Sequence, residues 1–361
     1  MRLVSALTTA ALSLMLLSSP ALAFEAAKAR TVLARAVDQA IIPGYRAFEA
    51  STARLSGAMD ALCAAPSADK EQAARAAFTD TLKAWAPVEI IRNGPALEKN
   101  RFERVLYYPD RKGIALKQVQ AILSKKDETA TAAATLAGKS VGVQGLGALE
   151  FVLYGTGHEV LSKEPSSHRC RYGAAIAANL HGIAREFTAA WEAPDGIGAA
   201  WKAPGPDNPL FRTDAEAVTE LLGIMVHGAE MVRDQRLRAF AGSQEQKPNP
   251  KLAIFWRSGS TWTMIGADMA GLLDFWQKAG MNDLLEDDQR SVGTSIEFVM
   301  KSLKRTAGTI TPDIEAALGQ PEERARIDFL MLNGKDLITR LSEDYGKALG
   351  LGAGFSFSDG D

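Results

Sequence analysis

The sequence predicts an all-α protein made of two helical-bundle domains. Alanine, leucine, lysine and glutamate are abundant, and runs of the β-branched residues that favour strands are rare. Apolar residues recur at spacings of three and four over most of the chain, which is the period of an amphipathic helix. A length of 361 residues is enough for about two domains of ordinary size.

The first half of the chain carries the pattern of several helices. The clearest apolar stripe consists of Tyr45, Phe48, Thr52, Leu55, Met59 and Leu62. Pro43 and Gly44 lie just before it, so we expect the long first helix to kink or break there. Further stripes predict helices over 78–91, 114–123, 141–155 and 171–191.

The best candidate for a domain boundary is the segment 193–209, which is rich in proline and glycine. It divides the chain into an N-terminal helical domain, residues 24–195, and a C-terminal helical bundle, residues 205–361. In the second part, the apolar pattern predicts helices over 221–232, 258–279, 284–305 and 322–350. Four long helices there favour an up-and-down bundle.

The first 23 residues have the three parts of a secretory signal peptide. Met1-Arg2 supplies a short positive start, an apolar run follows, and Ala21-Leu22-Ala23 has the small-x-small form of a cleavage site. The apolar run is shorter than the roughly 20 residues that a membrane-spanning helix needs. We therefore expect cleavage after Ala23, no membrane span after cleavage, and a periplasmic location.

Charge excludes some partners. Removing residues 1–23 removes Arg2, so the formal net charge changes from −2 to −3. Binding to nucleic acid would require a basic patch, and no block of like charges occurs in the chain. Nucleic-acid binding is therefore not expected.

The chain has two cysteines, Cys63 and Cys170. Two cysteines are too few for a disulfide scaffold or a cysteine metal site. In an oxidising compartment a single bridge between them is the natural inference, with two buried thiols as the alternative. The loop that it closes would add about 4–5 kcal/mol of stability by chain entropy.

The most informative segment runs from Val141 to Gly157. It holds one charged residue, Glu150, within an apolar stripe formed by Leu146 and Leu153. A carboxyl group in such surroundings must find hydrogen bonds or a cation, or take up a proton. Glu150 is therefore either a functional-site residue or a structural partner of an arginine.

This segment resembles the signature helix of the imelysin family, whose motif is G-x-H-x-x-E. Gly145 and Glu150 match the motif, whereas Gly147 stands where the family has histidine. Other segments that resemble the family, in the same order, are Ile42–Phe48, Ala84-Trp85, Asn93–Pro95, Tyr108–Arg111 and Gly354–Asp361.

The resemblance implies two four-helix-bundle-like domains packed across a groove, with the motif near that groove. It also implies an exported binding or accessory component of iron or haem acquisition, with envelope iron-transport components as partners. Iron or haem would be the cofactor or ligand, and Glu150 a metal ligand. Glycine has no ligand atom in its side chain, so the role of the motif histidine does not transfer to Gly147.

A ligand in the groove could be contacted by further residues. Besides Glu150 and Gly145, the candidates are Trp85, Arg92, Asp110 and Arg257. Arg92 or Arg257 could neutralise Glu150, and a bidentate pair would be the strong form of that interaction. The serines after Arg257 could serve only as helix caps, and Trp85 could serve only in the core.

Two other classes of function remain open. The family carries a metallopeptidase label, but the H-E-x-x-H string of common zinc proteases is absent, and His227 and Glu230 alone have the spacing H-x-x-E. The other alternative is a protein that docks onto a partner without any ligand. A groove filled by side chains, with Glu150 tied to an arginine, would favour docking.

Overall fold

The computed structural model describes residues 25–242 and 247–351. The predicted signal peptide and the motif at 354–361 lie outside these residues. Across the described ranges every regular element is a helix, so the all-α prediction is confirmed. None of these helices is long and apolar enough to cross a membrane.

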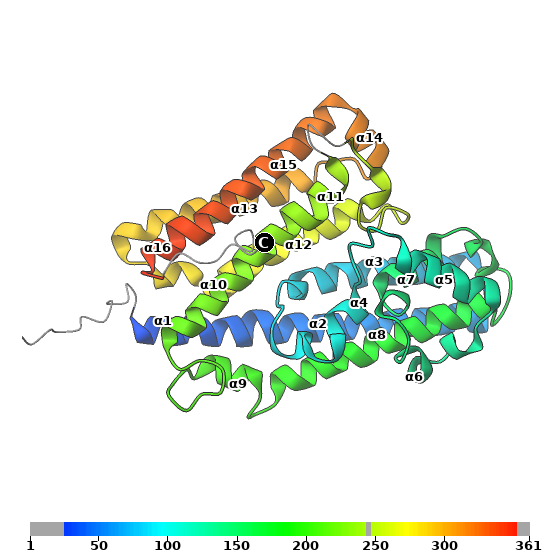
Figure 1. The fold of residues 1–361 in the computed structure, drawn as a ribbon, viewed down its shortest axis with the longest axis horizontal. Helices are drawn as coiled ribbons and strands as arrows, with labels where there is room; N and C mark the ends of the chain where they lie inside the picture. The colour runs from blue at the N-terminus through cyan, green and yellow to red at the C-terminus, as the bar shows by residue number, and fades with distance from the viewer. Residues whose placement is uncertain (1–24, 243–246, 352–361) are drawn as a thin grey trace, which may run out of the picture.

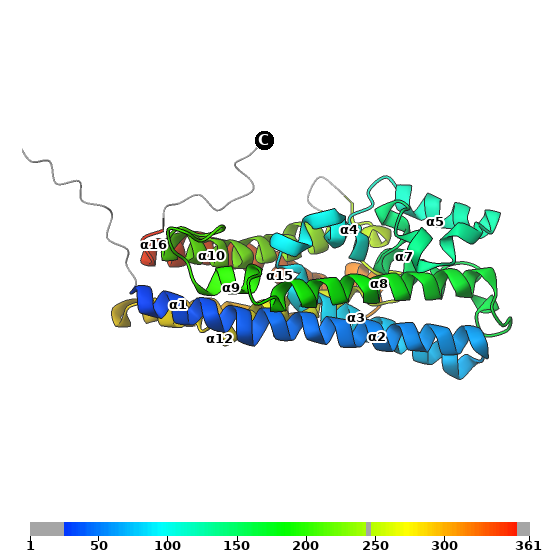
Figure 2. The ribbon, with the colours of Figure 1, turned by 90° about the horizontal axis from the view of Figure 1, so that it is seen from below.

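The first set of long helices forms the lower part of the molecule in Figure 1. It consists of α1 (Ala26–Arg35), α2 (Ile42–Ala64), α3 (Ala68–Glu89) and α8 (His168–Glu192). Helix α2 packs against both α3 and α8, and Figure 2 shows α2 and α8 running side by side. The stripe from Tyr45 to Leu62 is buried there, as its spacing predicts.

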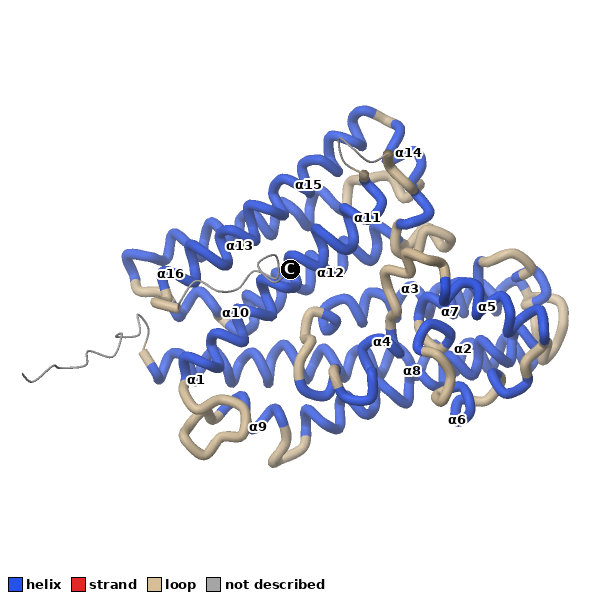
Figure 3. The backbone as a smooth tube through the Cα atoms, in the orientation of Figure 1, coloured by secondary structure: helices blue, strands red, loops and turns tan. Residues whose placement is uncertain are grey.

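The second set runs diagonally across the upper part of Figure 1. It consists of α10 (Asp214–Glu230), α12 (Thr261–Ala279), α13 (Arg290–Ala307) and α15 (Pro321–Thr339). Shorter helices connect the long ones: α4 (Arg101–Val105), α5 (Ile114–Lys125), α6 (Ala133–Leu136), α7 (Leu146–Tyr154), α9 (Ile197–Lys202), α11 (Arg238–Ala241), α14 (Ile314–Gly319) and α16 (Gly346–Ala348). The proline- and glycine-rich segment 193–209 holds α9 and its flanking loops (Figure 3).

A kink or a break was expected at Pro43, and the helix does not break there. The chain is helical from α1 through α2, and the turn before Pro43, Ala36–Ile41, is π-helical. A proline ring clashes with the carbonyl four residues earlier in an α-helix, and it has no N–H to donate. The wider π turn is a known way to change the spacing of a helix without ending it.

The predicted disulfide is present. Cys63 near the end of α2 and Cys170 in the first turn of α8 are bonded, and their Cα atoms are 5.5 Å apart. The bridge spans 107 residues of sequence. It therefore closes a loop that contains α3 to α7.

The two sets of helices share one continuous buried core. Helix α12 of the second set packs along α3 of the first, and α1 lies against α10 and α12. Near the middle of this contact lies a cluster of buried charges. Glu89 ends α3, Arg236 lies in the π-helical segment Met231–Leu237 that follows α10, and Asp268 is in α12.

These three side chains are at most 1% exposed. Arg236 Nη2 donates to both oxygens of Glu89, at 2.9 and 3.0 Å. Asp268 Oδ2 lies 3.9 Å from Arg236 Nε. Burial, and then the negative charge of Glu89, raise the pKa of Asp268 well above its usual range. The arginine thus has Glu89 as its hydrogen-bonded counter-ion, and burial beside Glu89 favours the neutral form of the Asp268 carboxyl group.

We expect Glu89→Gln to lower the free energy of unfolding by about 3–5 kcal/mol, because it leaves Arg236 buried without a counter-ion. Asp268→Asn, which keeps the shape of the side chain without its charge, should cost about 1 kcal/mol, because the raised pKa of Asp268 favours its neutral form. Urea unfolding followed by circular dichroism measures both. Equal losses would mean that Asp268 is ionised in the folded protein.

Candidate functional site

Glu150 lies in α7, where it is 4% exposed. Its Oε1 accepts hydrogen bonds from the backbone N–H and the hydroxyl of Ser258, both at 3.0 Å. Arg257 Nη1 lies 3.9 Å from the other oxygen, Oε2. Burial raises the pKa of Glu150, and the Ser258 N–H and Arg257 oppose this only in part. Ser258 therefore links α7 to the segment before α12, and it does not cap α12, whose N-cap residue is Ser260.

Arg257 is held by aromatic rings as well as by charge. Its guanidinium carbon lies 4.6 Å from the ring centre of Trp256 and 5.4 Å from that of Phe151. Such cation–π contacts fix the orientation of the planar group. The neighbouring Phe255 has φ 52°, a left-handed conformation that is strained for an aromatic residue. The segment 255–258 is thus held in an unusual path beside Glu150.

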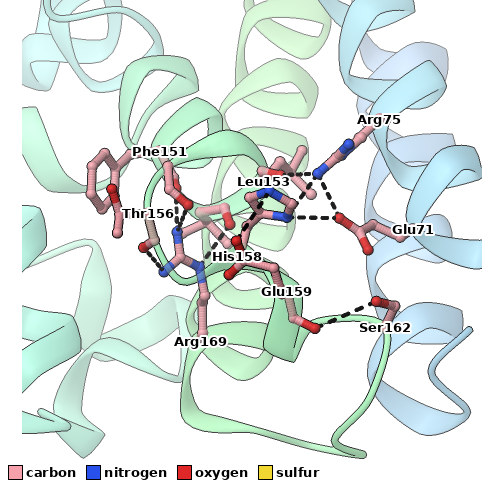
Figure 4. A network of polar contacts seen from close by, with 11 residues as sticks. Glu71, Arg75, Phe151, Leu153, Thr156, His158, Glu159, Ser162 and Arg169 are labelled. Carbon is pink, nitrogen blue, oxygen red and sulfur yellow. Dashed lines mark hydrogen bonds and ion pairs between the residues drawn. The ribbon is translucent and has the colours of Figure 1, made fainter. Parts of the chain in front are cut away.

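Helix α7 is held at its C-terminal end by two arginines from the long helices (Figure 4). Arg169 of α8, 8% exposed, donates to the carbonyl groups of Phe151, Val152, Gly155 and Thr156. Arg75 of α3 donates to the carbonyl of Leu153 and also contacts Glu71 and His158. Because the last carbonyls of a helix lack partners within it, these contacts fix α7 and therefore Glu150.

Neither Arg169 nor Arg75 stands out in the sequence as a site residue. Arg169 is next to Cys170, and burial lowers its pKa to about 10. Nothing in the local pattern distinguishes it from an arginine on a solvated helix face, because its partners are carbonyl groups. One feature of the sequence indicates that another element must bind the end of α7. The residues after Glu150 in this helix, 151–154, offer no side chain that could cap its last carbonyl groups.

A cavity of about 630 Å³ opens beside Glu150, between α7 and the segment 251–257. Loop 106–113 and Asp234 with Arg238 complete its walls. In Figure 3 the loops between α11 and α12 lie where the second set of helices approaches α7. The structure therefore has an open cavity at the groove, and at the same place a carboxyl group close to an arginine.

Four of the six predicted ligand-site residues line this cavity: Glu150, Gly145, Asp110 and Arg257. The side chain of Asp110 binds the backbone, because its two oxygens accept hydrogen bonds from the N–H groups of Ile114 and Leu116. It therefore caps α5.

The structure does not bring the other two residues to this cavity. Trp85 is 1% exposed and packs against Phe48 and Phe102. Arg92 lies over the ring of Phe102 and lines a second cavity of about 610 Å³, which His227 and Glu230 also line. His227 and Glu230 are hydrogen-bonded to each other at 3.1 Å.

The two glycines of the motif have different surroundings. Gly145 precedes α7 in extended conformation, and a Cβ there would lie 2.5 Å from the carbonyl oxygen of Val105. The predicted helix 141–155 is therefore shorter than expected. Because Gly145 lies in extended conformation against Val105, α7 begins only at Leu146. Gly147 is exposed to the cavity, and a Cβ there would meet nothing within 4 Å. A side chain is sterically allowed where the sequence has none.

The side chains do not form a coordination set for a bare iron ion. Metal sites built by proteins bring several donor side chains together. In residues 25–242 and 247–351, no three His, Cys, Asp or Glu side chains are placed to hold a metal ion. The charged group closest to Glu150 is the cation Arg257, which would repel a metal.

The fold and the site define an all-helical protein with a ligand-sized cavity among its short helices α5, α7 and α11. The family model of imelysin, designated peptidase family M75, matches residues 41–341, so the chain belongs to the imelysin family. No curated protein matches the sequence.

Two solved structures share the fold. An imelysin-like protein from Psychrobacter arcticum has a TM-score of 0.78 at 18% identity, covering 93% of this chain and 99% of that one. A protein from Parabacteroides distasonis, described as a precursor of iron-regulated protein A, has a TM-score of 0.73 at 14% identity. That match covers 90% of this chain and 96% of the other.

We expect Gly145→Ala to destabilise the protein by about 1–3 kcal/mol, because the new methyl group would press on backbone atoms that cannot move freely. Gly147→Ala should instead stabilise it by about 0.4–1 kcal/mol, since alanine reduces the freedom of the unfolded chain. Thermal unfolding of both variants checks this. A stabilising Gly145→Ala would contradict the close approach to Val105.

The raised pKa of Glu150 predicts a dependence of stability on pH. Below its ordinary value of 4.5 the carboxyl is protonated in both states, and its stabilising contribution is fully present. As pH rises from there through the folded-state pKa, the unfolded chain releases its proton first, so stability falls. Melting temperatures across this range should fall for the wild type relative to Glu150→Gln. Parallel profiles would show that Glu150 is ionised when folded.

Proposed function

We propose that this protein is a periplasmic ligand-binding component of iron or haem acquisition. The observation that supports this most directly is the open cavity at the imelysin motif, bounded by the short helices α5, α7 and α11 and by the loops 106–113 and 251–257. Its volume falls within the range of small-molecule sites, roughly 300–1,000 Å³.

The link to iron comes from the family and from one relative of the same fold, which is described as iron-regulated. The predicted signal peptide supports the periplasmic location, and envelope iron-transport components are the proposed partners. Haem and iron chelates carry most of their own donor atoms. The cavity would therefore need to recognise the complex rather than to coordinate a bare ion.

The docking alternative also has an observation in its favour, the contact of Glu150 with Arg257. In a purely structural role this contact would join α7 to the segment before α12, and the cavity would take no ligand. The metallopeptidase alternative would require a metal site and cleavage of a peptide that a chelator abolishes. Binding measurements separate these alternatives.

The test is titration of the purified mature protein with haem and with ferric citrate by calorimetry. We expect at least one of them to bind at micromolar concentration or below. Gly147→Phe, which would place a ring in the cavity, should weaken that binding at least about tenfold by occluding the ligand's space. Gly182→Phe is the matched control, because Gly182 lies on the exposed face of α8 and a Cβ there also meets nothing within 4 Å.

Two outcomes would contradict the proposal. If neither haem nor ferric citrate binds, the role in iron or haem acquisition is rejected. If unchelated iron binds tightly and Glu150→Gln abolishes this binding, Glu150 is a metal ligand and the coordination set is completed in a way that the described residues do not show.

A further inference from the structure

We propose that the cavity beside Glu150 recognises a small organic anion with carboxylate groups and a flat apolar part, and that Arg257 is its principal charged contact. This inference rests on the proposed function only in that the cavity is a ligand site. It names the chemical class of the ligand, which neither the family nor the related structures supply.

The acidic side chains of the cavity are already engaged. Glu150 accepts two hydrogen bonds from Ser258. Asp110 accepts from two backbone N–H groups at the start of α5. Asp234 contacts Arg233 Nη1 at 2.6 Å and Arg238 Nη1 at 3.5 Å. Each acidic group of the lining in residues 25–242 and 247–351 therefore already has a partner within the protein.

The basic side chains of the cavity have fewer partners of opposite charge. Arg111, Arg238, Lys251 and Arg257 line the cavity, so cations outnumber the three acids. Arg111 and Lys251 form no ion pair with any part of the chain that the structure describes. Among the residues that the structure describes, Arg257 forms an ion pair only with Glu150, at 3.9 Å, which is too long for a hydrogen bond. Arg257 thus presents several N–H donors without an acceptor, in the geometry that matches a carboxylate.

The apolar walls favour a flat ligand. Phe151, Phe255 and Trp256 line the cavity next to Arg257, and the rings of Phe151 and Trp256 already hold its guanidinium plane. An aromatic ring with carboxylates could pack on these side chains while its charged groups reach Arg257. Because Trp256 and Arg257 are only partly buried, such a ligand can enter without a large rearrangement.

The experiment uses calorimetry on the full mature protein with probes that contain no iron. Phthalate and succinate both carry two carboxylates, but only phthalate has an aromatic ring. Benzamidine has the ring with a positive charge. We expect phthalate to bind more tightly than succinate, benzamidine not to bind, and added sodium chloride to weaken phthalate binding.

Arg257→Gln should weaken phthalate binding about 10- to 100-fold, the loss typical of a hydrogen bond to a charged group. Arg257→Lys, which keeps the charge without the planar fork, should recover part of the affinity and shows that the fold is intact. The control is Arg46→Gln, because Arg46 is an exposed arginine of α2 that pairs with Glu192 outside the cavity. It should bind phthalate like the wild type.

The inference is overturned if benzamidine binds in place of phthalate, if neither dicarboxylate binds, or if Arg257→Gln behaves like the control. These results are separable from the iron proposal. Phthalate binding that depends on Arg257, without any binding of haem or ferric citrate, would support the anion site and reject the role in iron acquisition. Haem binding that is indifferent to Arg257, without dicarboxylate binding, would do the reverse.

Discussion

The buried ion pair between Glu89 and Arg236 sets the geometry on which the cavity depends. It joins the end of α3 to the π-helical segment after α10, where the two sets of helices meet. Residues on either side of Arg236 in sequence, Asp234 and Arg238, form part of the cavity wall. The guanidinium also lies 4.8 Å from the ring centre of Tyr108, whose hydroxyl donates to the carbonyl of Leu252 across the cavity. This ion pair supplies no atom to the cavity. It nevertheless positions the wall residues Asp234 and Arg238, and through Tyr108 it also positions the loop 106–113 and Leu252.

The helical fold follows from the sequence because its signals are local. Spacings of three and four predict α2, α8, α10 and α12 without reference to any partner. The exceptions are places where a contact that the local pattern does not show determines where a helix begins or continues. The helix continues past Pro43 because a π turn accommodates the ring, and α7 starts late because Gly145 meets the backbone of Val105.

The candidate site was predicted in part. Glu150 and Arg257 stand out because one is a lone acid in an apolar stripe and the other begins a segment of small polar residues. Their meeting depends on tertiary structure, as does the role of Ser258, whose spacing is equally compatible with a helix cap. Arg169 carries no sequence signal at all, since its partners are carbonyl groups of α7. Gly147 was recognisable as a missing ligand, whereas the open space around it became visible only in three dimensions.

The bond between Cys63 and Cys170 has a consequence for the integrity of the chain. It connects the end of α2 to the start of α8, so every residue of the intervening loop, including all of α7, lies inside a covalent ring. A protease that cuts once within this ring leaves both fragments attached to each other. The exposed loops around α5 and α6 can therefore be cut once while the helix that carries Glu150 stays tethered to its supports.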